Sequence, residues 1–149
     1  MLFRSAEKEP LAKEGKTKKQ KPLPPIRDDE KPFELPDGWL WCRLFEVTSI
    51  LGDGLHGTPT YSKKGNIFFV NGNNLVNGKI VIKDNTKTTD EREFLKHKQP
   101  LMDRTVLVSI NGTLCNVAFY NEEKIILGKS ACFFNLMIGI DKYYIKRFI

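Results

Sequence analysis

The chain has 149 residues, of which 40% are hydrophobic and 11% are aromatic. This composition is typical of a globular protein rather than a disordered chain, and the length is sufficient for one domain with a buried core. The formal net charge is +6 at pH 7, with a sequence pI of about 9.2. A basic balance favours a polyanionic partner, but many soluble proteins are equally basic, so charge alone does not identify a nucleic-acid-binding protein.

The sequence disfavours membrane insertion, secretion and a zinc site. No apolar run approaches the roughly 20 residues that span a bilayer, and the start MLFRSAEKEP lacks the apolar centre of a secretory signal. We therefore expect a cytoplasmic protein. Cys42, Cys115 and Cys132 show no CxxC spacing, and two histidines do not complete a structural zinc site. We expect reduced, mostly buried thiols, and no metal or cofactor.

Residues 1–36 differ in composition from the rest of the chain. They hold six of the eight prolines, the charge run KTKKQK and the motif PLPPI. PLPPI predicts an extended, polyproline-like segment. Residues 6–21 have no sustained apolar stripe and predict only the frayed end of a helix. We interpret KTKKQK as a solvated linker in preference to a dedicated phosphate-binding patch.

The chain after Pro36 predicts a mixture of short helices and strands. Four apolar residues at helical spacing predict a short helix: Leu40, Trp41, Leu44 and Val47. The Asn77-Gly78 pair predicts a turn, with a second strand over residues 79–83. Apolar runs predict further strands over residues 67–70, 106–110, 116–120, 125–127 and 131–138.

Acidic capping signals predict two more helices. Thr88-Thr89-Asp90-Glu91 predicts a helix start, and this helix is expected to run to about Lys98 and stop before Pro100. Asp141 is expected to cap a final helix whose apolar residues are Tyr144, Ile145 and Phe148. The elements together predict an α+β (mixed α/β) fold with a short, mostly β core and a few helices.

Catalytic constellations are missing from the sequence. A Cys–His dyad of His56 and Cys115 would require hydrogen-bond reach between DGLHGTP and NGTLCN, and no sequence feature brings these segments together. No Gly-rich phosphate loop, HExxH, GxSxG, nuclease-like acidic arrangement or NPPY-like methyltransferase motif is present. We therefore expect a binding protein rather than an enzyme.

Polar loops are the better candidates for a functional site. Asn bonds the edge of adenine, Lys bonds guanine, and Thr and Ser serve both bases and phosphates. The candidates before residue 67 are His56, Thr58, Thr60, Tyr61, Lys63 and Lys64. Those in the middle of the chain are Asn71, Asn73, Asn74, Asn77, Lys79, Lys83 and Lys87. A third group contains Asn111, Thr113, Asn116, Lys129 and Ser130.

Ordinary structural roles compete with these interpretations. Asn and Gly are common turn formers, so for any single Asn a turn is favoured over base contact. Exposed aromatic pairs beside basic residues would suit single-stranded nucleic acid. However, adjacent residues on a strand point to opposite faces, so we expect one of each pair to pack in the core. The pairs are Phe68-Phe69, Phe119-Tyr120, Phe133-Phe134 and Tyr143-Tyr144, and we expect Trp39 and Trp41 to anchor the domain entrance.

Five motifs in one order carry a resemblance to a known family. They are LAKEGKTKKQKPLPPI, LPDGWLWCRL, DGLHGTPTY, GNIFFVNGNNLVNGKI and SINGTLCNVAFY. The order resembles the target recognition domain of type I restriction-modification specificity subunits, from about Leu11 to the last residue. The resemblance implies sequence-specific binding of double-stranded DNA, which directs methylation by a partner methyltransferase subunit and, through it, cleavage by a restriction subunit.

The resemblance also implies a domain organisation. Residues 1–35 would be the end of a spacer helix and a basic, Pro-rich linker, and residues 36–149 a single compact target recognition domain that is incomplete at its C-terminus. The chain would then be the second half of a subunit, truncated at both ends. Family members usually have glycine where Cys115 stands, so this residue is expected to strain its turn. Because members read different sequences, base or phosphate contacts are expected over residues 61–64 and 83–87 in preference to Gly57 or Thr58.

Two other roles are considered beside DNA recognition. The chain is alternatively an assembly fragment that self-associates or docks through its PLPPI and WLW segments. It is alternatively an inactive relic of a specificity subunit, because the spacer helices that dock such subunits are almost entirely missing from it.

Overall fold

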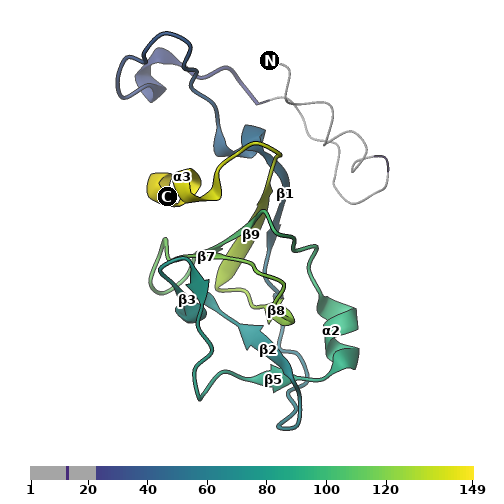
Figure 1. Cartoon of the computed structure of the whole chain (residues 1–149). Helices are drawn as coiled ribbons and strands as arrows, with labels where there is room; N and C mark the ends of the chain where they lie inside the picture. The colour runs from purple at the N-terminus through teal and green to yellow at the C-terminus, as the bar shows by residue number, and fades with distance from the viewer. Residues whose placement is uncertain (1–12, 14–22) are drawn as a thin grey trace. The chain divides into compact units, whose positions relative to one another are not determined.

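The computed structural model describes Lys13 and residues 23–149 (Figure 1). The chain divides into two compact units, unit 1 (Met1–Ser49) and unit 2 (Ile50–Ile149). Apart from Lys13, the helix end predicted for residues 6–21 and the KTKKQK run lie outside the described residues. Among the helices that the structure describes, none is long and apolar enough to cross a membrane.

The described part of unit 1 has little regular structure. Its 3-10 helices are η1 (Asp28–Glu30) and η2 (Leu44–Val47). Arg43 donates two hydrogen bonds of 3.1 Å to the carboxylate of Glu30, and the rings of Phe33 and Trp41 meet edge to face at 4.9 Å. The short helix predicted from Leu40 onward is therefore confined to η2, because Trp41 packs on Phe33 and Leu40 is 85% exposed.

Unit 2 is built on two small sheets and a hairpin, and its first strand, β1, begins two residues before it, at Thr48. The four-stranded sheet has the order β1 (Thr48–Asp53), β9 (Ala131–Leu136), β6 (Thr105–Ser109) and β7 (Val117–Phe119). The three-stranded sheet has the order β5 (Thr88–Thr89), β2 (Ile67–Val70) and β8 (Ile125–Leu127), with β2 parallel to β8. The mixed α+β class predicted from the sequence is confirmed.

The hairpin of β3 (Leu75–Val76) and β4 (Lys79–Ile80) lies against β7. Its turn residues Asn77 and Gly78 have φ values of 47° and 87°, the left-handed pair that a two-residue hairpin requires. Gly78 N donates to the carbonyl oxygen of Val117 at 2.8 Å, and Phe119 N donates to that of Gly78 at 3.0 Å. The predicted turn is confirmed. The second strand ends early, at Ile80, because the chain opposite it beyond Leu75 is the 3-10 helix η3 (Gly72–Asn74) and not a strand.

The core of unit 2 comes from the central strands. Residues with almost no exposed surface include Ile67 and Val70 of β2, Leu107 of β6 and Ile126 of β8. The strands predicted over residues 67–70 and 125–127 are confirmed with the same bounds, and the other three predicted strands are confirmed with ends shifted by one or two residues.

Both helices predicted from acidic caps are confirmed. In α2 (Glu91–His97) the carboxylate of Asp90 accepts a hydrogen bond of 3.0 Å from Glu93 N, and the helix ends before Pro100. In α3 (Lys142–Phe148) the carboxylate of Asp141 accepts one of 2.8 Å from Tyr144 N. Of the three apolar residues predicted for this helix only Ile145 is buried.

Some burial predictions are wrong. All three cysteines are free thiols, as expected, but Cys42 and Cys115 are exposed because they lie outside the strands, and Cys132 is half-buried. Phe69 is buried and Phe68 less so, which agrees with alternation, whereas Phe133 and Phe134 are both buried, so both faces of β9 are covered. Tyr143 and Tyr144 are both exposed on α3, where strand alternation does not apply.

Candidate nucleic-acid interface

Three loops that carry predicted site residues meet where β2, β6 and β8 end. They are residues 71–74, which include η3 (Gly72–Asn74), residues 110–116 and residues 128–130, and we call them the loop cluster. Ser130 joins them: its hydroxyl accepts a hydrogen bond of 2.8 Å from Gly72 N, and its carbonyl oxygen accepts one of 3.0 Å from Ile110 N. The exposed predicted residues of this cluster are Asn73, Asn111, Thr113 and Lys129.

Asn74 has a different position from its neighbour Asn73. Its side chain is 3% exposed, and its amide nitrogen donates to Val81 O at 2.9 Å and to Thr86 Oγ1 at 3.0 Å. Its amide oxygen accepts from Asn71 N at 3.0 Å. Because both donors already have internal partners, we interpret Asn74 as a residue that holds the loop together and not as one that reaches a ligand.

Asn71 and Asn116 also contribute to the framework of the cluster. The half-buried Asn71 accepts a hydrogen bond of 3.1 Å from Ser130 Oγ through its side-chain oxygen. Asn116 N donates to the hydroxyl of the buried Ser109 at 2.9 Å, and this hydroxyl donates in turn to Thr113 O. These bonds fix the backbone on both sides of the exposed turn at Asn111.

Cys115 lies in the same turn, with φ at 60°. This is the left-handed conformation that glycine adopts at little cost and that other residues adopt with strain. The strain predicted at Cys115 from the sequence is therefore confirmed.

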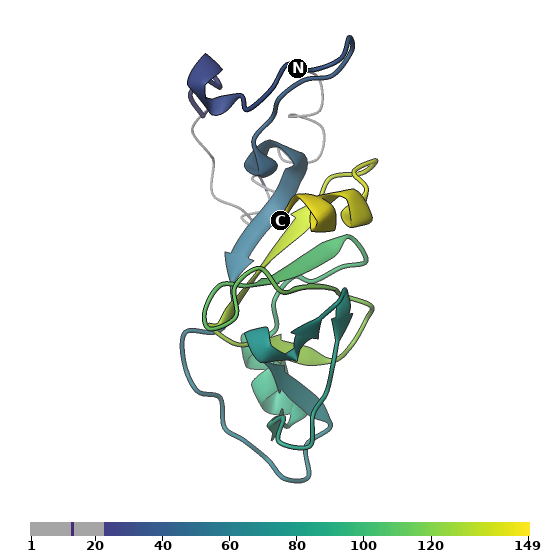
Figure 2. The same ribbon diagram turned by 90° about the vertical axis from the view of Figure 1, so that its left-hand side faces the viewer.

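The long loop between β1 and β2 runs along the three-stranded sheet (Figure 2). Leu55 N donates to the carbonyl oxygen of Leu127 in β8 at 2.6 Å, and Ser62 N donates to that of Thr88 in β5 at 2.8 Å. Between these points Thr60 N donates to the carboxylate of Glu93 in α2 at 2.8 Å. The loop is therefore held at three places along its length.

The predicted site residues of this long loop lie on its outer side. Five of these residues are exposed: His56, Thr58, Thr60, Lys63 and Lys64. Tyr61 is partly exposed, and its ring centroid lies 5.8 Å from that of Phe69. His56 Nε2 lies 3.5 Å from a carboxylate oxygen of Asp53.

Lys83 and Lys87 lie on the connection from β4 to β5 and are exposed. The carbonyl oxygen of Lys87 accepts a hydrogen bond of 2.8 Å from Phe69 N. Lys83 N donates to Thr86 Oγ1 at 2.9 Å, the same hydroxyl that Asn74 contacts. The buried Asn74 thus joins this lysine-bearing segment to the loop cluster.

The structure also brings together cations that sequence reasoning did not assign to a site. Lys142 and Lys146 of α3 lie near the β3–β4 turn, together with the predicted residue Lys79. Lys142 Nζ lies 5.3 Å from the ring centroid of Phe119, and a Cβ added to Gly78 would lie 3.7 Å from Lys146 Nζ. The signal in the sequence is the i, i+4 spacing of two lysines in KYYIKRF.

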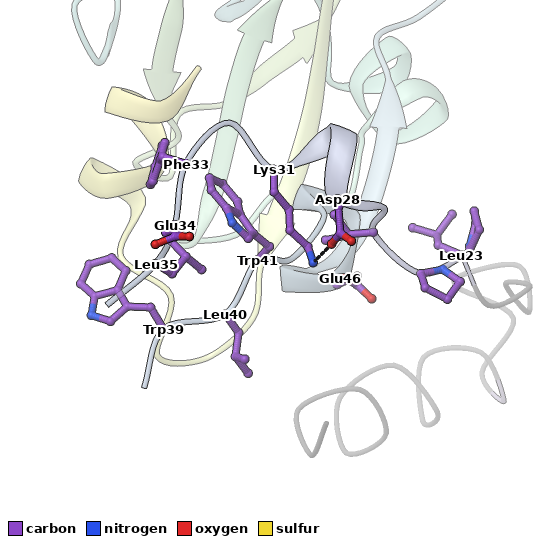
Figure 3. A pocket seen from close by; sticks show the side chains of 13 residues that line it. Leu23, Asp28, Lys31, Phe33, Glu34, Leu35, Trp39, Leu40, Trp41 and Glu46 are labelled. Atoms are coloured by element: carbon purple, nitrogen blue, oxygen red, sulfur yellow. Dashed lines mark hydrogen bonds and ion pairs between the residues drawn. The ribbon is translucent and has the colours of Figure 1, made fainter. Parts of the chain in front are cut away.

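A separate hollow of about 1000 Å³ lies within unit 1 (Figure 3). Its lining is mostly apolar and includes both the PLPPI and WLW segments. Figure 3 shows the hydrogen bond between Lys31 and Asp28 along this hollow, and its length is 2.7 Å. Trp39 is 60% exposed, so the prediction that it anchors the domain entrance is not matched by a buried position.

Metal coordination finds no support among residues 23–149. In this described part of the chain, no three or more His, Cys, Asp or Glu side chains are grouped so as to hold a metal ion. The exposed groups of the loop cluster are amides, hydroxyls and ammonium groups, which bind ligands by hydrogen bonds and charge.

Comparison with known proteins gives two related matches. No family model matches the chain. It is 69% identical over 45 residues to the type I restriction enzyme EcoAI specificity subunit of Escherichia coli, and 65% identical over 48 residues to the EcoEI specificity subunit of the same organism. The matches cover 30% and 32% of this chain and 8% of each relative. They confirm, over about 30% of the chain, the resemblance to type I specificity subunits that its motifs predict.

Proposed function

We propose that unit 2 binds double-stranded DNA in a sequence-specific manner, as part of the specificity subunit of a type I restriction-modification complex. The observation that carries this proposal is the loop cluster. Exposed amide, hydroxyl and ammonium groups lie there on a backbone that partly buried hydrogen bonds hold in place.

A protein that reads a DNA sequence needs side chains whose polar groups are exposed and whose backbone is held in a fixed position. Asn73 and Asn111 offer amides that match the edge of adenine, and Lys129 offers an ammonium group that matches guanine. Their backbone is fixed by Ser130 and Ser109. The exposed lysines at positions 63, 64, 83 and 87 supply charge for phosphate contacts, which carry affinity but no sequence information.

The proposed partners follow from the relatives. The two similar proteins are specificity subunits of type I restriction enzymes. For this chain we propose a methyltransferase subunit as the direct partner and a restriction subunit bound through it. Methylation and cleavage then belong to those partners, and this chain contributes recognition without a cofactor of its own.

The proposal is tested by binding to a random-sequence duplex over a salt series, with single-stranded DNA as the control. We expect duplex binding that weakens steeply as salt rises, because lysines displace counterions from phosphates. Selection from random duplexes should then enrich one motif. A folded chain that enriches no motif, even with the methyltransferase subunit present, would overturn the proposal.

A matched pair of variants locates the reading surface. Asn111→Ala should cost about 1–3 kcal/mol of discrimination at one base pair of the selected motif. Asn121→Ala changes another exposed asparagine, outside the loop cluster, and should leave discrimination unchanged. Equal effects of the two substitutions would show that the loop cluster does not read bases.

One observation favours assembly as a second role. The hollow of unit 1 is bordered by the exposed side chains of Phe33, Trp39 and Leu40. Light scattering and co-purification with the methyltransferase subunit test this role. We expect the Trp39→Ala/Leu40→Ala variant to lose the association that the unmodified chain shows, and a strictly monomeric chain that never co-purifies would exclude it.

A further inference from the structure

A group of four cations lies around the β3–β4 turn and α3. Lys79 follows the turn, and α3 contributes Lys142, Lys146 and Arg147. Lys146 Nζ lies near Gly78 and Lys142 Nζ lies over the ring of Phe119. We call these four residues the α3 patch. It joins one turn and one helix that are far apart in the sequence.

The charges of the α3 patch lack opposite partners. Within residues 23–149, no ion pair involves Lys79, Lys146 or Arg147. Lys142 Nζ donates to a backbone carbonyl oxygen, that of Asp103, at 3.3 Å. The carboxylate of Asp141 is occupied as the helix cap.

This arrangement works against the stability of the helix. Lys142 and Lys146 are four residues apart on α3, and like charges at that spacing destabilise a helix. Lys146 and Arg147 stabilise the helix in part, because cations in the last turn of a helix interact favourably with its dipole. That effect does not explain Lys79, which belongs to the hairpin, and a bound anion would remove the repulsion for the whole patch.

The patch lies within reach of a duplex that contacts the loop cluster. β7 begins directly after the 110–116 loop and ends at Phe119, beneath Lys142. At a rise of about 3.3 Å per residue its three residues span roughly 10 Å, which is less than the width of about 12 Å of a DNA major groove. A duplex whose major groove faces the loop cluster, with a flanking strand on the side of β7, brings the phosphates of that strand to α3.

We propose that the α3 patch binds the phosphate backbone of duplex DNA beside the bases that the loop cluster contacts. The proposal rests on the proposed function and adds a second contact surface to it. Phosphate contacts fix the register of a protein on DNA and are independent of sequence. The patch thus positions the duplex, and the loop cluster reads it.

The test compares two charge-matched double variants of the full chain. Lys146→Gln/Arg147→Gln removes two cations of the patch. Arg92→Gln/Lys98→Gln removes two exposed cations, Arg92 in α2 and Lys98 at its C-cap, and α2 lies away from α3 in both views of the ribbon (Figures 1 and 2). Binding to a fluorescent random-sequence duplex is measured over a salt series. Thermal unfolding of each variant verifies that it remains folded.

We expect the slope of log affinity against log salt to become shallower by about 2 in the patch variant, since each lost phosphate contact removes roughly 1 from the slope. The loss should be equal for duplexes of different sequence, and the α2 variant should keep the original slope. An unchanged slope in the patch variant, or an equal change in both variants, overturns phosphate binding by the α3 patch and leaves the proposed function intact. A folded, unmodified chain that binds no duplex overturns both.

Discussion

The backbone amide of Thr60 donates a hydrogen bond of 2.8 Å to the carboxylate of Glu93, which is only 8% exposed. The same carboxylate lies 3.6 Å from His97 Nε2 and 3.8 Å from Lys96 Nζ. One buried acid of α2 thus holds the middle of the long loop between β1 and β2. The positions of the loop's exposed side chains depend on it.

Glu93→Ala should release this loop from α2. The Thr60 amide loses its acceptor, so its hydrogen exchange should become faster, and unfolding free energy should fall by about 1.5–3 kcal/mol because the lost bond is made to a charged group. Glu93→Gln keeps an acceptor oxygen and should restore most of the protection. Glu91→Ala, an exposed acid of the same helix, is the control. Equal exchange rates at Thr60 in all variants would contradict this role.

Asn74 and Asn73 should respond oppositely to replacement by alanine. Asn74→Ala leaves the carbonyl oxygen of Val81 without this donor and Asn71 N without its acceptor, so we expect a loss of about 1–3 kcal/mol in unfolding free energy. Asn73→Ala removes an exposed side chain and should change stability by less than about 0.5 kcal/mol. Chemical denaturation measures both. If Asn73→Ala costs as much as Asn74→Ala, the scaffold role of Asn74 is wrong.

Two glycines in the same loop differ in the space around them. A Cβ added to Gly54 would overlap the carbonyl group of Gly128, whereas a Cβ added to Gly57 would have no atom within 4 Å. Gly54→Ala should therefore lower the unfolding free energy by about 1–3 kcal/mol, since the backbone of β8's end must move. Gly57→Ala should change it by less than about 0.5 kcal/mol. Thermal or urea unfolding of the pair distinguishes these outcomes, and similar stabilities would refute the close approach at Gly54.

Replacing Cys115 with glycine should stabilise the protein. The left-handed backbone at this residue costs a non-glycine side chain roughly 1–2 kcal/mol, part of which the greater freedom of glycine in the unfolded chain offsets. We expect a gain of about 0.5–1 kcal/mol in urea unfolding. Cys42→Gly, at a position without positive φ, should give a loss instead. A loss at both positions would show that the turn is not strained.

Cys132 should react slowly with alkylating reagents. Burial raises the pKa of its thiol, and the nearby carboxylate of Asp53 raises that pKa further. Because the thiolate is the reacting form, the alkylation rate should rise only above the pH at which an ordinary cysteine reacts. Asp53→Asn should shift the rate profile to lower pH, and Asp84→Asn should not. The folded pKa exceeds the unfolded one, so this group's contribution to stability is present at lower pH and is lost as pH rises through the folded pKa.

Sequence patterns predicted elements whose cause is local. The apolar run of β2 and the acidic caps Asp90 and Asp141 carry their own structural signal, and each appears where expected. The burial of Phe133 and Phe134 depends on what covers the two faces of β9, and the elements that cover a strand are not visible in its own residues. The strand predicted over residues 79–83 is longer than β4 because its partner β3 has only two residues and is preceded by the 3-10 helix η3.

The candidate site shows the same division. The polar loops were predictable because amides, hydroxyls and turn residues are plain in the sequence. Asn73 and Asn74 are identical in type and adjacent, and only the return of residues 81–86 onto Asn74 separates an exposed side chain from a buried one. The α3 patch was missed because Lys79 and Lys146 meet only through tertiary structure.

The docking of the β3–β4 turn on β7 affects how the protein behaves at high concentration. β7 is an outer strand of its sheet, and its backbone groups at Val117 and Phe119 are already bonded to Gly78. An unpaired outer strand is a template on which a second chain can add, leading to aggregation. With this turn in place, a strand of a second chain can pair with the edge of β7 only after the hairpin detaches. The hairpin that presents Lys79 is therefore also a barrier to fibril formation.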